Sequence, residues 1–375
     1  MLREIEYLSV YYDIVVIGHG KPDPNWQNVT WYPIDRRTQW LDEFAIRFFL
    51  LVGKLWNPLY ETGYWLRPLH KKALHCAIAC QADAFYANDW QAIPIAVEAS
   101  RHDQIPILFD AHEYAPLQRE DHLLWKLFYS PLISHMIFRY APRISATITV
   151  AIPIAKRYEQ EYSLGKPIVV YNAPKQRIDH PKQIDHNHIQ LIHHGGAHKK
   201  RQLELMIRAI ALTDPRFSLH FMLVGSDTYI NKLRRLANQI APDRVFFHQP
   251  VAPSQIVEQI HQYDMGFYLL KPSNYNQAMG TPNKFFDFLA AGLAVCIGPS
   301  PAMAELVHQY RVGIVASSFN PIDVANTLNK ITVEQIVMMQ HAACKASLLF
   351  NAETEMVKVV NLCKHLLSES APKHE

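Results

Sequence analysis

The sequence has few of the features that mark disulfide-bonded, membrane-spanning or nucleic-acid-binding proteins. Its five cysteines form no Cys-x-x-Cys pair, and an odd number of cysteines indicates a reduced, cytoplasmic protein. Only 19% of the residues are charged, and the net charge of +3 is small for a chain of 375 residues. A nucleic-acid partner is therefore not expected.

Long apolar runs are missing as well. The longest uncharged run, residues 288–304, contains two prolines and two glycines, which exclude a membrane-spanning helix. The chain begins Met-Leu-Arg-Glu-Ile-Glu, with acidic residues where a signal peptide has its apolar core. We expect a cytoplasmic protein that is soluble or lies against the inner face of a membrane and does not cross it.

What the sequence does contain is a repeated alternation of strands and helices. Apolar runs typical of buried strands occur at 13–18, 84–87, 107–109, 146–150 and 168–171, and again at 189–193, 219–224, 245–248, 266–269, 294–297 and 313–315. Helical stretches separate them, which predicts two α/β domains with parallel, doubly wound sheets. The polar run 175–188 is the expected linker between domains at 1–174 and 189–349. Residues 350–375 form a last helix and a loose tail.

One stretch, Met279 to Gly292, combines several local signals. Pro282 suits the first position of a helix, because its missing N–H would have no partner there. Apolar residues then recur at helical spacing until Gly292 ends the helix, and a buried strand, residues 294–297, follows at once.

The start of this helix is suited to bind a phosphate. Its free N–H groups come from Gly280, Thr281 and Asn283, and Lys284 adds a positive charge. Asp287 lies one turn further along, where its carboxylate can accept two ribose hydroxyls. Together these residues indicate a nucleotide site. The alternative is an ordinary helix that precedes a strand and carries a surface lysine.

The same stretch and four others resemble the glycosyltransferase family 4 type of enzyme, the glycosyl transferases group 1, which have the GT-B fold. The matching residues are Pro282–Val295, His193–Gly196, Arg201, Val224–Gly225 and Asp110–Glu113. The resemblance is strongest from about residue 189 to residue 330. It implies two Rossmann-like domains that face a cleft, and a C-terminal helix that crosses back to the first domain.

The resemblance also implies roles for individual residues. Gly195 and Gly196 allow the backbone to approach a phosphate closely. Arg201 occupies the position of a basic residue that holds the diphosphate, and Gly225 that of a glycine that contacts the nucleotide. Arg201 and Lys284 would stabilise the leaving diphosphate.

The first domain supplies one further candidate. His112 resembles a histidine that faces the donor sugar and helps proton transfer, with Glu113 as its candidate partner. We therefore take His112, Arg201 and Lys284 as the catalytic candidates.

Three departures from the family pattern leave other functions open. Met279 replaces the first of two acidic residues, Gly196 replaces a basic residue, and a first strand with its glycine-containing loop is absent before the N-terminal helix. Either the chain is truncated or the site is built differently. The alternatives are an inactive partner subunit that binds a nucleotide sugar, and a sugar-nucleotide epimerase or hydrolase on the same fold.

A metal or other cofactor is not expected. The sequence has no Asp-x-Asp motif, which metal sites that bind diphosphates commonly need. His193, His194 and His198 invite a metal interpretation, but a glycine-rich phosphate loop explains that region better. The donor is expected to be a sugar linked to a nucleoside diphosphate of the UDP or GDP type.

Two segments, 36–80 and 123–143, are rich in aromatic and basic residues. Such segments pack into a core or lie in a membrane interface, and the sequence leaves both open. With the resemblance, they suggest a glycan or lipid-linked acceptor and a role in polysaccharide biosynthesis. The predicted function is a retaining, metal-independent glycosyltransferase of the hexosyltransferase type.

Overall fold

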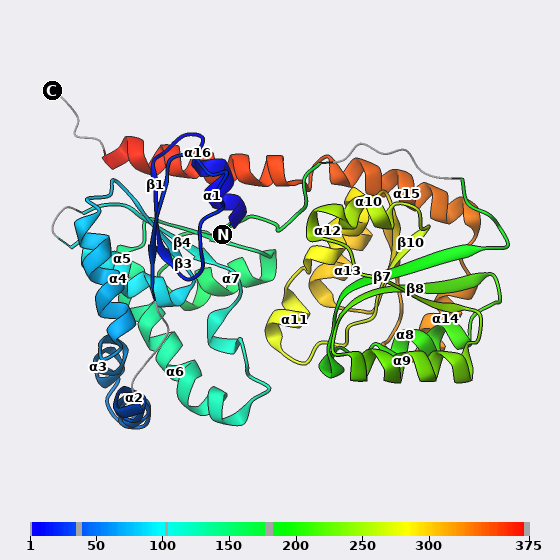
Figure 1. Ribbon diagram of the computed structural model, residues 1–375, viewed down its shortest axis with the longest axis horizontal. Helices are drawn as coiled ribbons and strands as arrows, with labels where there is room; N and C mark the ends of the chain where they lie inside the picture. The colour runs from blue at the N-terminus through cyan, green and yellow to red at the C-terminus, as the bar shows by residue number, and fades with distance from the viewer. Residues whose placement is uncertain (1, 35–39, 102–103, 177–182, 371–375) are drawn as a thin grey trace. The chain divides into compact units, whose positions relative to one another are not determined.

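The computed structural model describes residues 2–34, 40–101, 104–176 and 183–370, and its contacts divide the chain into two compact units (Figure 1). Unit 1 comprises Met1–Val170, Asn274–Asn276 and Met356–Glu375, and unit 2 comprises Tyr171–Ser273 and Gln277–Glu355. Part of the predicted linker, residues 177–182, and the predicted tail, residues 371–375, lie outside the described residues.

The divisions fall near residues 170 and 355, where the sequence suggested 174 and 349. The reason lies in Tyr171. Its ring packs against Phe286 and Phe350, with centroids 5.0 and 5.3 Å apart, and its N–H donates to the Glu355 carboxylate at 2.9 Å. Tyr171 and the residues that hold it are therefore part of the core of unit 2.

Unit 2 is built on one six-stranded sheet in the order β12-β11-β10-β7-β8-β9, with each neighbouring pair parallel. The strands are β7 (Ile189–Ala197), β8 (Phe217–Gly225), β9 (Val245–His248), β10 (Met265–Tyr268), β11 (Ala294–Ile297) and β12 (Gly313–Val315). Each overlaps a run that the sequence predicted as a strand. β10 and β11 are buried along their whole length, as expected for parallel strands covered on both faces.

Helices cover both faces of this sheet. The helices are α8 (Glu204–Ala211), α9 (Asp227–Ile240), α10 (Ile256–Ile260), α12 (Asn283–Ala290), α13 (Pro301–Tyr310), α14 (Pro321–Asn329) and α15 (Val333–Ser347), with short 3-10 turns at Lys199–Arg201 and Pro253–Gln255. In Figure 1, α8 and α9 lie on one side of the sheet, and α10 and α12 lie on the other. α12 sits close to β10 because Gly266 has no side chain: a Cβ there would lie 2.3 Å from the Phe288 ring.

Unit 1 contains a second parallel sheet, of four strands in the order β3-β4-β5-β6. These strands are β3 (Phe85–Asn88), β4 (Ile107–Ala111), β5 (Ala146–Thr149) and β6 (Ile168–Val169). A separate parallel pair joins β1 (Ile14–Gly18) to β2 (Val29–Pro33). β1 was predicted, whereas β2 was missed because its residues are largely exposed and lack a buried apolar run.

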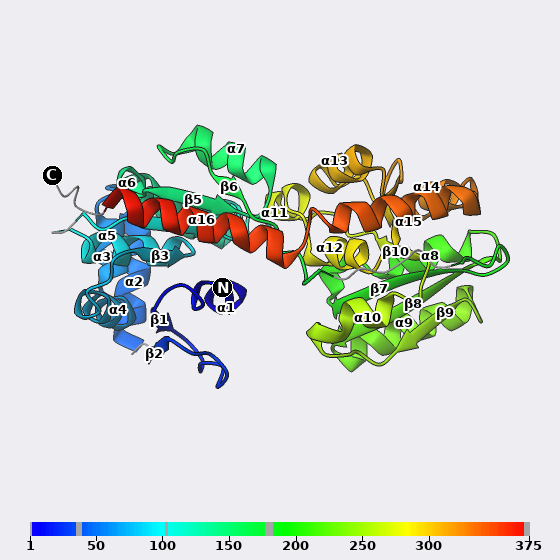
Figure 2. The ribbon, with the colours of Figure 1, turned by 90° about the horizontal axis from the view of Figure 1, so that it is seen from above.

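The helices of unit 1 surround this sheet. They are α1 (Leu2–Leu8), α2 (Trp40–Val52), α3 (Leu59–Trp65), α4 (Pro68–Ala79), α5 (Ile93–Ala99), α6 (Leu123–Tyr140), α7 (Ile152–Glu161) and the greater part of α16 (Ala352–Ser370), with 3-10 turns at Trp90–Ala92, Ala115–Leu117 and Ala141–Arg143. One more short helix, α11 (Tyr275–Met279), begins in unit 1 and ends in unit 2. α16 adds Met356 and Val359 to a core that also holds Leu108 of β4 (Figure 2). The prediction of two α/β domains with parallel sheets is confirmed.

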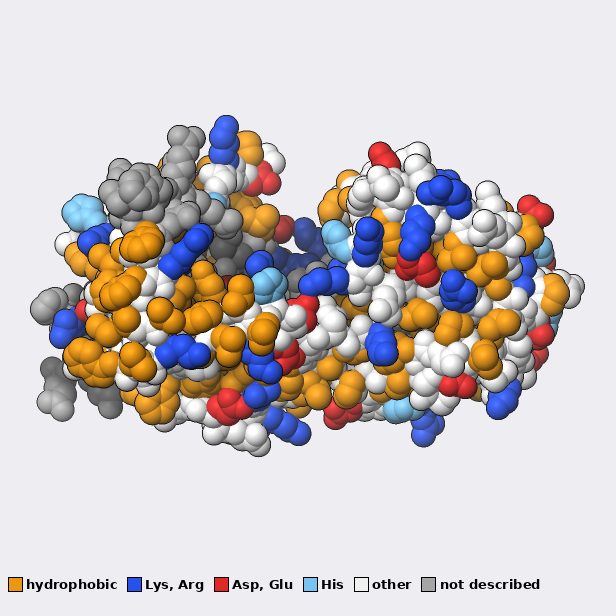
Figure 3. All heavy atoms as spheres, turned by 90° about the horizontal axis from the view of Figure 1, so that it is seen from below, with side chains coloured by type: hydrophobic (Ala, Val, Ile, Leu, Met, Phe, Trp, Pro, Cys, Tyr) orange, Lys and Arg blue, Asp and Glu red, His pale blue; other side chains and the backbone are white. Residues whose placement is uncertain are grey.

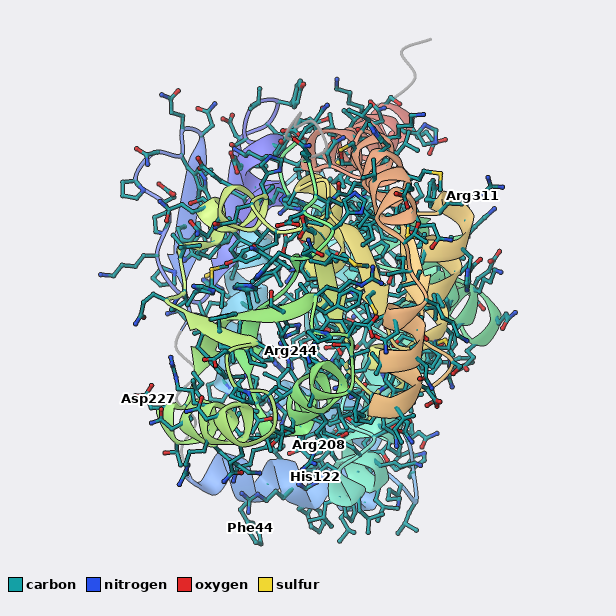
Figure 4. The ribbon with its side chains drawn as sticks, turned by 90° about the vertical axis from the view of Figure 1, so that its right-hand side faces the viewer. Phe44, His122, Arg208, Asp227, Arg244 and Arg311 are labelled. Carbon is teal, nitrogen blue, oxygen red and sulfur yellow. The ribbon has the colours of Figure 1, made fainter. Side chains whose placement is uncertain are left out.

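The aromatic and basic segments divide between core and surface. Tyr60 and Tyr64 of α3 are buried. By contrast, a row of large apolar side chains is exposed on α2, in the turn after it and on the first turns of α6: Phe44, Phe48, Leu51, Leu55, Leu123, Leu124 and Leu127. We call this the α2–α6 face. Figure 3 shows hydrophobic side chains gathered on this side of unit 1 with basic ones among them, and Figure 4 shows Phe44 pointing away from its helix. Among the described residues, no helix is long and apolar enough to cross a membrane.

Candidate functional site

The candidate site of unit 2 begins at the N-terminus of α12. The structure corrects one detail of the prediction, because Pro282 is the N-cap and Asn283 is the first helical residue. Proline offers no side-chain acceptor, and no side chain caps the helix. Its first N–H groups are therefore available to an anion. The preceding Gly280 and Thr281 lie between α11 and α12, with Thr281 almost fully buried and Asn283 exposed.

Lys284 reaches from α12 to the carboxyl end of β7. Gly195 has φ of +98°, and a methyl group added to it would lie 2.9 Å from Lys284 Nζ and 3.0 Å from Lys284 Cε. Gly195 therefore serves two purposes: it permits a backbone conformation that other residues rarely adopt, and it leaves room for the lysine. The prediction that β7 ends at residue 193 was wrong, since the strand continues through Gly195 and Gly196 to Ala197.

Arg201 lies beside the same strand end. It closes the 3-10 turn that precedes α8 and is not part of that helix. Its Nη1 donates to the carbonyl oxygen of Gly196 at 3.1 Å. The turn thus holds the guanidinium against β7, while the neighbouring Lys199 and Lys200 are exposed.

The two cations are not neutralised by acids. Within the described part of the chain, neither Lys284 nor Arg201 forms an ion pair. Burial, and then the charge of Arg201, lower the pKa of Lys284 to about 8, while Asp287 opposes the change. A pair of half-buried positive charges beside an uncapped helix N-terminus is the arrangement that a diphosphate would complete.

Asp287 lies one turn into α12, as predicted, and its side chain is 16% exposed. Its Oδ2 lies 3.5 Å from Nε2 of His194, whose ring packs edge-on against Phe288. Burial, and then the charge of Lys284, lower the pKa of His194 to about 3. The neighbouring His193 is also buried, and its Nδ1 pairs with the carbonyl oxygen of Phe267 at 2.9 Å.

The remaining predicted residue of unit 2, Gly225, ends β8 and lies opposite Ala197 in the strand register. Gly225 and Gly195 therefore belong to the same carboxyl edge of the sheet. The sequence analysis missed Tyr268, which ends β10 on this edge and whose ring centroid lies 6.0 Å from Lys284 Nζ. Its place at the end of a predicted parallel strand was the signal that could have identified it.

His112 lies in unit 1, just after β4, and its side chain is 41% exposed. Its Nε2 lies 2.6 Å from Oδ1 of Asn88 and 3.6 Å from Oδ2 of Asp110. The predicted partner Glu113 does not hold it, because the Glu113 carboxylate accepts from the side-chain amide of Gln118 at 2.5 Å. Burial raises the pKa of Asp110 and of Glu113.

The described ranges, with their gaps at 35–39, 102–103 and 177–182, contain no cluster of three His, Cys, Asp or Glu residues suited to hold a metal ion. His193 and His194 each face a different neighbour, Phe267 and Asp287.

With this geometry, the chain resembles solved structures of the GT-B fold. HepE from Anabaena in complex with UDP and glucose has 16% sequence identity and a TM-score of 0.67, with 97% of this chain and 95% of that chain covered. WaaG, a glycosyltransferase involved in lipopolysaccharide biosynthesis, has 11% identity and a TM-score of 0.63, over 96% and 94% of the two chains. A trehalose-6-phosphate protein from E. coli bound with UDP-2-fluoro glucose has 11% identity and a TM-score of 0.65, over 97% and 95%. These likenesses define the fold as GT-B.

The sequence of unit 2 also matches a family model. Residues 188–333 match the family model of the glycosyl transferases group 1, and this match confirms the resemblance found in the sequence. The matched region contains Gly195, Arg201, Gly225, Lys284 and Asp287. No curated protein matches the chain significantly.

Proposed function

We propose that the protein is a retaining glycosyltransferase that moves a sugar from a nucleoside diphosphate sugar, of the UDP type, to a glycan or lipid-linked acceptor. The observation that carries this proposal is the pair of cations, Lys284 and Arg201, which converge on the end of β7 and form no ion pair with any acid that the structure describes. The choice of UDP is supported by HepE, whose structure was solved in complex with UDP.

In the proposed donor site, each group has one task. The α12 N-terminus and Lys284 bind the diphosphate, and Arg201 stabilises the charge that develops on it as the bond to the sugar breaks. Asp287 accepts hydrogen bonds from the ribose hydroxyls. Because two side-chain cations supply the positive charge, the reaction proceeds without a metal ion or other cofactor.

Retention of configuration follows if the acceptor attacks on the face from which the diphosphate departs. A phosphate oxygen of the leaving group then takes the proton of the acceptor hydroxyl, and no separate pair of catalytic carboxylates is needed. His112, in unit 1, hydrogen-bonds the sugar.

Binding and turnover are tested separately. Isothermal titration of the full chain with UDP, GDP and ADP identifies the base, and release of the nucleotide from its sugar is then measured with and without oligosaccharide or lipid-linked acceptors. Arg201→Ala should lower the turnover number about 100-fold. Lys199→Ala, which removes an exposed charge two residues away, should change neither quantity.

Each alternative predicts a distinct result. Nucleotide binding without turnover under any acceptor would identify an inactive partner subunit, and turnover without an acceptor would identify a hydrolase or an epimerase. If no nucleoside diphosphate binds, the donor site itself is wrong.

We also propose that the α2–α6 face associates with an anionic membrane surface where the acceptor is held. Phe44, Phe48 and Leu51 recur at i, i+4 and i+7, which places them on one side of α2, and the exposed Leu55 lies in the turn that follows. Lys54, in the turn after α2, has its Nζ 5.2 Å from the centroid of the Phe128 ring of α6 and adds positive charge. Apolar and basic side chains together are the composition of an interfacial surface.

Co-sedimentation with vesicles of phosphatidylglycerol and phosphatidylcholine tests this surface. The double variant Phe48→Ser, Leu51→Ser should lose binding, whereas Leu212→Ser, which changes an exposed leucine of unit 2, should retain it. Equal sedimentation of all three proteins, or none with the unaltered chain, would contradict membrane association.

A further inference from the structure

The imidazole of His112 is held through only one of its two nitrogens. Nε2 lies between two side-chain oxygens, Oδ1 of Asn88 at 2.6 Å and Oδ2 of Asp110 at 3.6 Å. Nδ1 has no hydrogen-bond partner among the residues that the structure describes. The two nitrogens therefore differ in their surroundings, and this difference sets the protonation of the ring.

Both oxygens are acceptors. Oδ2 of Asp110 accepts the hydroxyl hydrogen of Tyr86 at 2.8 Å, so that this oxygen presents a lone pair to the histidine. The amide oxygen of Asn88 is also an acceptor. A bare Nε2 would place three lone pairs against one another. The stable neutral form of His112 carries its hydrogen on Nε2 and leaves Nδ1 unprotonated.

The sheet itself fixes this arrangement. Asn88 ends β3 and Asp110 lies near the end of β4, and the two residues are directly paired in the strand register. Asp110 is only 3% exposed, and its hydrogen bond to Tyr86 links it a second time to β3. Its carboxylate cannot rotate away without losing that hydrogen bond. The histidine is thus oriented by rigid elements and not by a loop.

We infer that Asn88 and Asp110 are positioning residues, which hold His112 in the Nε2–H form so that Nδ1 accepts a hydrogen bond from a sugar hydroxyl of the substrate. This inference rests on the proposed function for the identity of the substrate, but not for the tautomer. The arrangement has the logic of a carboxylate that orients a catalytic histidine. Here the order of the nitrogens is reversed, since the carboxylate faces Nε2 and the substrate faces Nδ1.

The tautomer can be observed directly. In the full chain labelled with ¹⁵N-histidine, a nitrogen that carries hydrogen and one that does not have widely separated chemical shifts, and His112→Gln identifies the signals of His112 by their loss. At a pH where the ring is neutral, Nε2 should be protonated and Nδ1 bare. Asn88→Leu and Asp110→Asn should produce a mixture of both forms. Asn88→Asp, which keeps an acceptor oxygen, should retain the single form.

Glu113→Gln is the matched control, because this carboxylate is the next residue but is held by Gln118. It should leave the His112 signals unchanged. A hydrogen on Nδ1 in the unaltered protein would overturn the inference, and so would signals that stay the same in both Asn88→Leu and Asp110→Asn.

Kinetics give the second readout. When Nδ1 of His112 is no longer held as a hydrogen-bond acceptor, the turnover number of Asn88→Leu and Asp110→Asn should fall by up to about tenfold, with the KM for the nucleotide sugar nearly unchanged. The two proposals fail separately. If the spectra show Nε2–H but no donor is turned over, the proposed function is wrong and the positioning remains. If transfer proceeds while the spectra show Nδ1–H, the positioning alone is wrong.

Discussion

Replacement of Lys284 by methionine should stabilise the free protein and abolish diphosphate binding. Methionine has a similar length and no charge, so that it fills the space above Gly195 without the burden of a buried ammonium group. The two effects have opposite signs because the charge is unfavourable in the free protein and favourable only when an anion is bound.

The magnitude follows from the pKa. Burial, together with the charge of Arg201, lowers the pKa of Lys284 from 10.5 to about 8, and each unit corresponds to about 1.4 kcal/mol. The charged lysine therefore destabilises the folded protein by up to about 3 kcal/mol, and relaxation of a half-buried side chain reduces this to about 1–3 kcal/mol. For a unit of this size, a gain of 1 kcal/mol raises the melting temperature by about 2–4 °C.

The pH dependence has a defined sign. Between about pH 8 and pH 10.5 the unfolded chain holds the lysine proton and the folded chain has lost it, so the free energy of unfolding rises with pH. Below about pH 8 both states are protonated, and the full destabilisation is present. The advantage of Lys284→Met should therefore be constant at neutral pH and shrink as the pH approaches 10.5.

Differential scanning calorimetry with and without UDP measures both effects. The variant should melt higher than the unaltered protein when free, and UDP at 100 times the original Kd should stabilise only the unaltered protein, by about 2.7 kcal/mol. Lys199→Met, at an exposed position, should stay within about 0.5 kcal/mol of the unaltered protein. A free Lys284→Met protein that melts lower would refute the reasoning, because Lys284 would then be a structural residue.

Three further predictions concern the same site. UDP affinity should fall above about pH 8, by at most about tenfold per pH unit. Lys284→Arg, whose guanidinium stays charged, should flatten this dependence of affinity on pH. If the arginine leaves the dependence unchanged, another group causes it. Gly195→Ala should destabilise the protein by about 1–3 kcal/mol and weaken UDP binding, since it forces a non-glycine residue to positive φ and displaces Lys284. Gly196→Ala meets only the ends of the flexible His198 and Arg201 side chains among its nearest contacts, and it should have a smaller effect on stability in the same calorimetric experiment. The unaltered protein should bind UDP at least about 10-fold more tightly than 2′-deoxy-UDP, and Asp287→Ala should bind the two nucleotides with nearly equal affinity. If the variant still prefers UDP, the ribose binds elsewhere.

The sequence predicted the fold well where buried strands appear as clear apolar runs. Ala294–Ile297 and Gly313–Val315 were predicted with the bounds that the structure has, because an apolar run between a glycine and a turn has few other interpretations. β2 was missed because its residues are largely exposed, and α11 because its five polar and apolar residues have no periodicity.

The site was predicted as a set of residues but not as a set of contacts. Asp287 and Lys284 could be identified from their spacing in the helix. The contact of Lys284 with Gly195 could not, because it depends on how the lysine side chain extends from α12 to β7. Glu113 was taken as the partner of His112 because it is adjacent in sequence. The true neighbours, Asn88 and Asp110, come together through the register of two strands, which the sequence alone does not give.

The contact between Lys284 and Gly195 has a consequence for how such a site can change by substitution. A Cβ at position 195 would lie 2.9 Å from Nζ of Lys284 and would displace the end of this side chain, so the effect of either substitution depends on the other. With glycine at position 195, the lysine of the helix can lie directly over the strand end. With any other residue there, the same lysine has to take another path. The two positions therefore form one epistatic pair.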